Sequence, residues 1–466
     1  MLGRTRRVHF VGIGGIGMSG IAELLANLGY AVSGSDARSS EITERLASLG
    51  VRVALGHAAA NVGDADVVVT SSAVHPNNPE VDEARARHIP VIPRAEMLAE
   101  LMRLKFGIAI AGAHGKTTTT SMVALMLERA GLDPTAVIGG RLSAFGSNAR
   151  LGQGEYVVAE ADESDRSFLR LSPSIAVVTN LDREHMDTYG SFEGIVDAFV
   201  DFAGKVPFYG AVVACVDDPP IAAMLPRLAR RTITYGFSER ADVRGDQPVT
   251  DGQSGRCLVR FNVRGIPGGA GSGALRLNVP GRHNLLNALA AVSVGLELGV
   301  PFERISAALT EFRGVERRYQ TRGTAQGVTV IDDYGHHPSE IAVVLRAAQD
   351  GHPKRLVAVF QPHRYSRTRD LLHDFGPALA LADVVVLTDI YSAGEAPIEG
   401  ITIGALAAAV RPHVRSLHVV PALDDVPAAV AGLATDGDLV VTLGAGSIGA
   451  AGDRILHALS GKVSAR

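Results

Sequence analysis

The sequence predicts an α/β protein of three domains in which parallel strands alternate with helices. Its 466 residues correspond to about three domains of roughly 100–200 residues each. Runs rich in β-branched residues alternate with helical patterns in the first and last thirds of the chain, as they do in βαβ units. Glycine-rich turns also follow strand-like runs at Gly12, Gly112 and Gly444, and the carboxyl ends of parallel strands are where such folds bind ligands.

The first third has the pattern of a Rossmann-like domain, which we expect over residues 1–106. Strands are predicted at 8–13, 31–35, 66–71 and 91–92, and a helix at 19–28. The last third, residues 315–466, has the same pattern and predicts a second Rossmann-like domain. Its strands are expected at 328–331, 356–360, 384–387 and 439–443.

The middle third, residues 107–314, is expected to have a P-loop-type ATPase fold. Strands are predicted at 106–111, 156–159, 175–179 and 211–215, and a helix at 121–130. The glycine-rich, alternating stretch 243–279 predicts antiparallel hairpins, and therefore a small antiparallel sheet in this domain.

Composition excludes several classes of function. The net charge is −4 and is mixed along the chain, so the sequence carries no basic footprint for nucleic acid. The two cysteines, Cys215 and Cys257, offer neither a disulfide framework nor metal-ligand spacing, which is typical of a cytoplasmic protein. No apolar run approaches the ~20 residues of a membrane helix, so no membrane partner is expected either.

The loop Gly112–Thr120 is the most informative motif of the chain. It follows a strand-like run and opens a helical pattern, so its backbone N–H groups can approach phosphate oxygens. Lys116 would bring a charge to the β- and γ-phosphates and Thr117 a hydroxyl to Mg²⁺. The usual loop has about four residues between its glycines, whereas this one has only Ala113 and His114. An ordinary helix cap beside a lysine is the alternative interpretation.

A second glycine loop, Gly12-Ile-Gly14-Gly15-Ile-Gly17, matches the dinucleotide fingerprint, with Asp36 following at the end of the next predicted strand. Taken alone it indicates NAD, but a UDP-sugar would satisfy the same pyrophosphate loop, and tight strand–helix packing needs glycine as well. The segment Gly444–Gly449 has the same spacing without an acidic partner, so we expect it to serve packing.

Polar clusters follow several strands of the middle domain. The acidic cluster 160–163 suits Mg²⁺ coordination beside a phosphate loop. His185, in the segment 180–187, is either a second metal ligand or a helix cap. Asn284 and Asn287 lie three apart on one helix face, where they can pair with adenine or, for Asn284, cap the helix.

The last domain carries two such clusters, at 332–338 and 361–368, each just past a predicted strand. Arg364 and Arg367 lie three apart in the second cluster, and arginine forks bind carboxylates in a bidentate manner. They therefore predict an anionic or carboxylate substrate. His336 and His363 lie in the same two clusters.

Together these motifs resemble those of the Mur ligase family of cell-wall synthesis, and the resemblance covers nearly the whole chain. Its signatures in chain order are 9–20, 112–118, 160–165, 185–187, 281–288, 332–338 and 361–368. Members of the family share the shortened phosphate loop, and their first domain holds the UDP of the sugar substrate. The branch that adds L-alanine to UDP-N-acetylmuramate is the most similar.

The resemblance implies an ATP- and Mg²⁺-dependent amide ligation in the cytoplasm by a monomer or homodimer, through an acyl phosphate. Implied catalytic residues are Lys116, His185, Arg318 and His336. ATP contacts are implied at Gly112, Ala113, His114, Gly115, Lys116, Thr117, Thr118, Asn284, Asn287, Arg318 and Asp333, and Mg²⁺ ligands at Thr117, Glu163 and His185. The UDP-sugar would meet Gly12, Gly14, Gly15, Gly17, Asp36, Ser71 and Ser72. The amino acid and its carboxylate would meet Tyr334, His336, His363, Arg364 and Arg367. Of these, His336 and His363 would orient the amine or take up its proton.

Two departures from the family pattern are visible. Many Mur ligases use a carbamylated lysine soon after the His-Met-Asp segment, but residues 191–204 contain no lysine, as is also typical of the L-alanine-adding branch. Asp182 and Glu184 stand where relatives more often have Glu and Asp. Three alternatives stay open: a sister ligase that adds a preformed peptide, an NAD-dependent dehydrogenase, and a nucleotide-binding regulator without catalysis.

Overall fold

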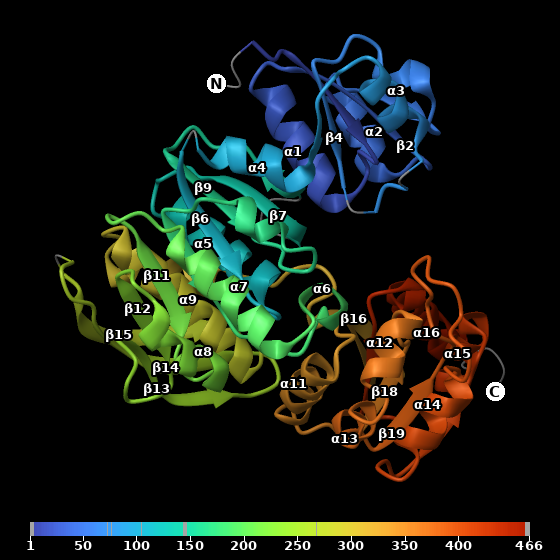
Figure 1. Cartoon of the computed structure of the whole chain (residues 1–466). Coiled ribbons are helices and arrows are strands. Elements are labelled where there is room, and N and C mark those ends of the chain that lie inside the picture. The colour runs from blue at the N-terminus through green and yellow to red at the C-terminus, as the bar shows by residue number, and fades with distance from the viewer. Residues whose placement is uncertain are drawn as a thin grey trace. The chain divides into compact units, whose positions relative to one another are not determined.

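The computed structural model describes residues 4–71, 73–75, 77–103, 105–142, 147–266 and 268–461, and it contains three sheets with helices packed on them (Figure 1). The chain divides into two compact units. The first comprises Met1–Gln247, Cys257–Leu275 and Leu286–Phe312, and the second Pro248–Arg256, Arg276–Leu285 and Arg313–Arg466. The three-domain α/β fold is confirmed by the structural comparison given below. The boundaries expected near 106 and 314 stay a prediction.

The first sheet is wholly parallel, with the order β3-β2-β1-β4-β5. This is the expected Rossmann-like pattern, with a change of direction beside β1. The strands are β1 (Arg7–Val11), β2 (Ala31–Asp36), β3 (Arg52–Leu55), β4 (Val67–Thr70) and β5 (Val91–Pro93). The helices are α1 (Ile16–Asn27), α2 (Glu41–Ser48), α3 (Pro79–Ala86) and α4 (Arg94–Met102), with a 3₁₀ turn at Ala59–Val62.

The second sheet has ten strands in the order β15-β14-β13-β12-β11-β10-β6-β9-β7-β8. The predicted hairpins, β13 (Val243–Thr250), β14 (Gly255–Asn262) and β15 (Ala270–Leu277), exist, but they extend the central sheet instead of forming a separate one. The sequence analysis missed the antiparallel pair of β7 and β8. The remaining strands are β6 (Phe106–Ala111), β7 (Thr135–Leu142), β8 (Ser147–Arg150), β9 (Tyr156–Glu160), β10 (Ile175–Val178), β11 (Ala211–Cys215) and β12 (Thr232–Gly236).

Helix α5 (Lys116–Arg129) begins directly after Gly115, inside the segment predicted as a loop and five residues before the predicted start. Threonine has a low helix propensity, so the run Thr117–Thr120 argued locally against a helix. The side chains of Thr119 and Thr120 are fully buried, and tertiary packing overrides their propensity. The other helices of this part are α6 (Met186–Tyr189), α7 (Phe192–Gly204), α8 (Pro219–Met224), α9 (Arg282–Glu297) and α10 (Phe302–Thr310).

The third sheet has the order β16-β17-β21-β18-β19-β20. Its strands are β16 (Gln320–Ala325), β17 (Val328–Asp333), β18 (Arg355–Phe360), β19 (Val384–Leu387), β20 (Leu417–Val419) and β21 (Asp438–Leu443). They are parallel except for β16, which the sequence did not predict. Since β17 and β18 flank β21, the polar clusters after β17 and β18 and the glycine segment after β21 meet at one edge of the sheet.

Helices cover both faces of the third sheet. They are α11 (Pro338–Gln349), α12 (Tyr365–Asp370), α13 (Phe375–Leu379), α14 (Ile403–Val410), α15 (Val426–Leu433) and α16 (Ala451–Gly461). Alternate residues of β18 belong to different cores: Leu356 and Phe360 face one, and Val357 and Val359 face the other. Strand β18 is therefore apolar on both faces, as a central parallel strand should be. Among the described residues no helix is both long and apolar enough to cross a membrane.

Candidate active site

The phosphate loop is a tight turn that only glycine can make. Gly112 has φ +136° and Gly115 φ +80°, both in the left-handed region. A Cβ at Gly112 would lie 2.1 Å from Thr179 Oγ1, and one at Gly115 would lie 2.7 Å from Asn287 Oδ1. The loop is therefore closed against the end of β10 on one side and against α9 on the other.

The two residues between these glycines are held by the segment that follows β10. The backbone N–H of Ala113 donates to Asn180 O at 3.0 Å, and that of His114 donates to Asn180 Oδ1 at 2.7 Å. Thr179 Oγ1 donates to His114 O at 2.7 Å. His114 Nε2 lies 2.9 Å from Asp182 Oδ2. These contacts fix the shortened loop before any ligand arrives.

Lys116, the first residue of α5, extends its ammonium over the loop. Its Nζ donates to Gly112 O at 2.6 Å, to Ala113 O at 3.1 Å and to Glu163 Oε1 at 2.7 Å. Burial acts to lower the pKa of Lys116, but the neighbouring carboxylates, Glu163 first among them, outweigh burial and raise it. The lysine is therefore a fixed positive charge at a helix N-terminus, where phosphate oxygens are attracted.

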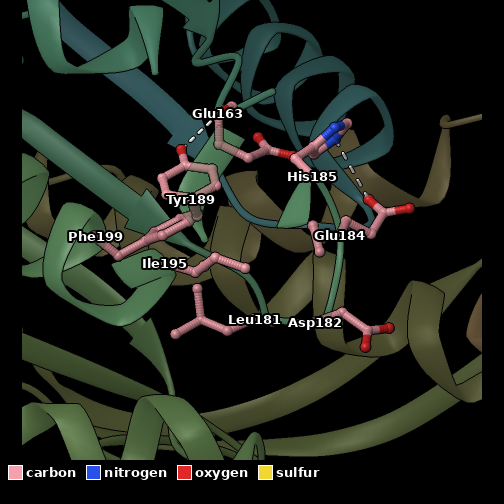
Figure 2. Close-up of a pocket in the computed structure, with 9 residues that line it drawn as sticks. Glu163, Leu181, Asp182, Glu184, His185, Tyr189, Ile195 and Phe199 are labelled. Atoms are coloured by element: carbon pink, nitrogen blue, oxygen red, sulfur yellow. Dashed lines mark hydrogen bonds and ion pairs between the residues drawn. The ribbon is translucent and has the colours of Figure 1, made fainter. Parts of the chain in front are cut away.

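Glu163, Glu184 and His185 each place one ligand atom within 4.8 Å of the others (Figure 2). Glu163 Oε2 is buried and has no hydrogen-bond partner among the described residues. Burial raises the pKa of Glu163 to about 7, although Lys116 acts in the opposite direction. A buried carboxylate oxygen without a partner is costly unless a cation or proton satisfies it. The two carboxylates fit Mg²⁺, which prefers oxygen ligands, and His185 would add a ring nitrogen.

The sequence left open whether His185 is a ligand or a helix cap. His185 precedes α6 with φ +56°, and its side chain makes no cap hydrogen bond there. The structure therefore favours the ligand interpretation, and it adds Glu184, which the sequence analysis did not propose as a ligand. The apolar side chains of Leu181, Ile195 and Phe199 line the same pocket (Figure 2). Thr117 is buried on the first turn of α5.

Asn284 and Asn287, in the first turns of α9, are both buried. Asn287 lies against Gly115 of the phosphate loop. Asn284 Nδ2 donates to Pro280 O at 2.7 Å. Its side chain thus donates at the start of the helix, whereas the N-cap alternative required it to accept from a backbone N–H.

The first glycine loop is held by hydrogen bonds to the end of β2, one of them to the carboxylate of Asp36. The N–H groups of Gly12 and Ile13 both donate to Ser35 O at 2.9 Å, and Gly14 N donates to Asp36 Oδ2 at 2.9 Å. In a dinucleotide domain the residue at the position of Asp36 binds a ribose. Here one of its oxygens holds the loop. Gly15 lies at the N-cap of α1 and Ser71 follows β4, whereas Ser72 lies outside the described residues.

Arg94, the first residue of α4, is a candidate that the sequence analysis missed. A Cβ at Gly17 would lie 3.0 Å from Arg94 Nη1, so the guanidinium rests against the glycine loop. Its Nη2 also lies 3.4 Å from Asp162 Oδ2. The available signal was its position directly after β5, at the carboxyl edge of the first sheet. A cation beside a glycine loop suits a diphosphate.

In the second unit, Asp333 organises the end of β17. Its carboxylate accepts from Tyr319 N at 2.7 Å and from Gly335 N at 2.6 Å. Burial raises the pKa of Asp333 to about 6, with Arg318 acting in the opposite direction. Arg318 lies over the ring of Tyr334 at 5.2 Å from the centroid. The predicted pair of Arg318 and Asp333 is thus brought together.

His336 and His363 also come together, with ring centroids 5.5 Å apart. Arg367 Nη1 lies 3.2 Å from His363 Nδ1, and Arg364, half exposed, lies 3.9 Å from Glu395. Burial, followed by the charges of His336, Arg367 and Arg364, lowers the pKa of His363 to about 3. The lowered pKa opposes uptake of a proton by His363, and this expected role stays a prediction. A guanidinium can only donate, so Nδ1 would accept from Arg367 and the neutral ring would carry its hydrogen on Nε2.

The glycine segment after β21 serves packing, as predicted. Arg317 Nη2 donates to Gly444 O at 2.6 Å, and a Cβ at Gly449 would lie 2.5 Å from Arg317 Cζ. A Cβ at Gly446 would lie 2.6 Å from Cγ of Tyr391. Tyr391 and Glu395 lie at this edge of the sheet in a segment that no predicted motif included.

Comparison with known proteins gives a consistent result over the whole chain. Family models match residues 7–106 (Mur ligase family, catalytic domain), 110–295 (Mur ligase middle domain) and 317–446 (Mur ligase, glutamate ligase domain). The chain is similar to the UDP-N-acetylmuramate–L-alanine ligases of Pelobacter propionicus, at 55% identity over 98% of this chain and 99% of that protein, and of Geobacter sulfurreducens, at 54% over 98% and 99%.

Solved structures agree. A UDP-N-acetylmuramate–alanine ligase from Thermotoga maritima superposes with a TM-score of 0.82 at 30% identity, covering 98% of this chain and 99% of that one. A murein peptide ligase from Psychrobacter arcticus gives 0.72 at 25%, covering 97% and 98%. The phosphate loop, the acidic pocket beside it and the three matched domains have one common explanation: the chain belongs to the Mur ligase family.

Proposed function

We propose that this protein ligates L-alanine to the lactyl carboxylate of UDP-N-acetylmuramate at the expense of ATP. A carboxylate oxygen attacks the γ-phosphorus, ADP leaves, and an acyl phosphate forms. The amine of L-alanine then attacks the acyl carbon, phosphate leaves, and the nitrogen loses a proton as the amide forms. Identity of 55% with the Pelobacter ligase over nearly the full chain supports this assignment.

The single structural observation that carries the proposal is the position of Lys116. Its ammonium lies over two loop carbonyls and beside Glu163, at the start of a buried helix. A charge fixed there stabilises the negative charge that develops on the transferring phosphoryl group. The loop N–H groups and the helix N-terminus bind the other phosphate oxygens.

Glu163, Glu184 and His185 would hold Mg²⁺, with Thr117 offering its hydroxyl from the first turn of α5. When bound, the cation would neutralise phosphate charge and polarise the γ-phosphoryl group. The protein's own contribution is to exclude water, because Leu181, Ile195 and Phe199 form the apolar wall of this pocket. Asn284 and Asn287 are proposed to meet adenine, with Arg318 and Asp333 completing the nucleotide contacts.

The first glycine loop is proposed to bind the diphosphate of the UDP-sugar through Gly12, Gly14, Gly15 and Gly17. Arg94 adds a guanidinium beside Gly17, and this cation favours a diphosphate over a neutral ligand. Asp36, Ser71 and Ser72 are proposed to lie near the uridine.

The amino-acid site is proposed to lie at the edge of the third sheet. Arg364 and Arg367 bind carboxylate, His363 donates from Nε2, and His336 and Tyr334 line the site. A carboxylate that is removed from water must be paired with a cation such as these arginines. A cytoplasmic location is part of the proposal, because ATP is one of the substrates, as is a monomer or homodimer.

A phosphate-release assay tests the function. The full chain is supplied with ATP, Mg²⁺ and UDP-N-acetylmuramate, and with L-alanine, glycine, L-serine or an L-alanyl peptide in turn. L-Alanine should give the highest kcat/KM. A preference for the peptide would assign the protein to the peptide-adding branch, and phosphate release independent of the UDP-sugar would remove the ligase assignment.

A further inference from the structure

The segment 389–395 packs against the amino-acid site through its backbone. Tyr391 N donates to Pro362 O at 2.8 Å, and Arg364 N donates to Tyr391 O at 2.8 Å. These two bonds lie on either side of His363 and form a parallel bridge between His363 and Tyr391. Tyr391 is therefore held in register with the histidine.

The ring of Tyr391 continues this contact. It stacks on the imidazole of His363, with centroids 5.6 Å apart and planes 16° from parallel. Cγ of Tyr391 packs against Gly446 so closely that a Cβ at Gly446 would lie 2.6 Å from it. Tyr391 is nevertheless 40% exposed. An aromatic side chain at the surface, stacked on a polar ring, is not filling the core.

The same segment also supports Arg364. This arginine has φ +72°, an uncommon conformation for a non-glycine residue, and the bond from its N–H to Tyr391 O holds it there. Glu395 accepts from Ser366 N at 3.0 Å and from Ser366 Oγ at 2.6 Å, and it lies 3.9 Å from Arg364 Nη1. The segment thus contacts both a histidine and an arginine of the proposed amino-acid site.

We propose that Tyr391 is a positioning residue of the amino-acid site: stacked on His363 and seated on Gly446, it fixes the plane of the imidazole and so the direction of the Nε2–H donor. This rests on the proposed function for the identity of the ligand, the L-alanine carboxylate. Arg367 fixes the ring at Nδ1, His336 contacts it edge-on, and Tyr391 covers a face. A hydrogen bond weakens steeply as its angle departs from linear, so loss of the stack should cost affinity.

Two variants test the stack from opposite sides. Tyr391→Leu removes the ring. Gly446→Ala keeps the tyrosine but adds a Cβ that would push its ring away from His363, and the same Cβ would lie 2.6 Å from Gln361 Oε1. Tyr391→Phe keeps the ring and is the conservative variant. Tyr209→Leu is the matched control, because Tyr209 is 62% exposed on a loop of the first unit. An aromatic pair of this kind corresponds to a change of roughly two- to tenfold in affinity.

The KM for L-alanine should rise by that factor in Tyr391→Leu and Gly446→Ala, with the KM values for ATP and UDP-N-acetylmuramate unchanged. Tyr391→Phe and Tyr209→Leu should keep the wild-type KM for L-alanine. Equal changes in all three KM values would indicate general damage and overturn the positioning role. So would a KM for L-alanine in Tyr391→Leu equal to that of the wild type.

Nitrogen NMR of histidine-labelled protein reports the tautomer of the imidazole directly and does not require the enzyme to turn over. The His363 signals, assigned by their loss in His363→Gln, should show a single Nε2–H tautomer in the wild type and in Tyr391→Phe, and shifted or averaged signals in Tyr391→Leu. Unchanged His363 signals in Tyr391→Leu would overturn the proposal. A wild type that shows the stacked His363 but does not ligate L-alanine would overturn the proposed function and leave the stack established.

Discussion

The ammonium of Lys116 lies 2.7 Å from the carboxylate of Glu163, and both side chains are largely withdrawn from solvent. Glu163 has its other oxygen buried without a partner in the described part of the chain, beside Glu184 and His185. Lys116 belongs to the proposed phosphate site and Glu163 to the proposed metal site, so this ion pair connects the two sites.

Lys116→Ala should lower the rate of ATP-dependent phosphate release by about 10²-fold or more, because it removes charge stabilisation from the transition state. Circular dichroism should show that the variant is still folded, although its melting midpoint should fall because Glu163 loses its buried partner. Lys205→Ala, at the exposed end of α7, is the control and should keep the wild-type rate. A folded Lys116→Ala variant with a normal rate would contradict the assignment of the loop.

Glu163→Gln should raise the Mg²⁺ concentration needed for half-maximal activity, because a neutral amide binds Mg²⁺ far more weakly than a carboxylate. A Mg²⁺ titration of phosphate release at saturating ATP measures this. Glu193→Gln, in an exposed position on α7, is the matched control. An unchanged Mg²⁺ requirement in Glu163→Gln would place the metal elsewhere.

Arg94→Ala should weaken the binding of UDP-N-acetylmuramate by about tenfold or more, because an arginine that pairs with phosphate contributes a charge-assisted hydrogen bond. Calorimetry with UDP-N-acetylmuramate and, separately, with NAD measures it. Arg103→Ala, exposed after the same helix, should have no effect. Tight binding of NAD with no response to the UDP-sugar would reverse the assignment of the first domain.

Arg364→Lys and Arg367→Lys keep the charge but lose the planar fork, so each should raise the KM for L-alanine, or for the muramoyl carboxylate, far more than the KM for ATP. Arg367→Lys should have the larger effect, since Arg367 also contacts His363 Nδ1 at 3.2 Å. Steady-state kinetics with each substrate varied in turn decides this. If both variants kept wild-type values for both substrates, the amino-acid site would lie elsewhere.

His363 should make the folded protein less stable in acid. Its pKa is lowered to about 3 in the folded state, so between the ordinary histidine pKa of about 6.5 and that value only the unfolded chain binds the proton. Burial of the neutral His363 ring therefore contributes fully to stability above the pKa of the unfolded chain, about 6.5. The contribution is lost as the pH falls below that value. His363→Asn should therefore show a smaller drop in melting midpoint from about pH 7 to about pH 5 than the wild type. His457→Asn, exposed on α16, should drop as the wild type does.

The alternation of strands and helices was sufficient to predict the central parallel strands, because buried β-branched runs are a strong local signal. The parallel-paired strands β3, β7, β12 and β20 were not predicted. Strand β16 was missed because Gln320–Ala325 is polar and short, and it is defined by its pairing with β17. The start of α5 was misplaced because burial of Thr119 and Thr120 is a tertiary effect.

The candidate site could be predicted where a motif carries its own chemistry, as at Lys116, Glu163 and Arg367. Tyr391 could not be predicted, because nothing in its neighbours in sequence shows what it contacts in space. Arg94 had only its position after β5 as a signal. Tyr391 reaches His363 only through the pairing of two segments 28 residues apart. The state of His363 was also hidden, since its pKa depends on burial and on charges from other segments.

The apolar wall formed by Ile195 and Phe199 beside Glu163 has a consequence for the conditions under which the enzyme works. Mur ligases that place a carbamylated lysine after the His-Met-Asp segment depend on dissolved carbon dioxide to form that group. Here α7 presents hydrocarbon to the pocket, and residues 191–204 contain no lysine to react. No lysine in this segment has to be carbamylated before the enzyme can work. Activity in degassed, bicarbonate-free buffer should therefore equal activity in buffer saturated with carbon dioxide at the same pH.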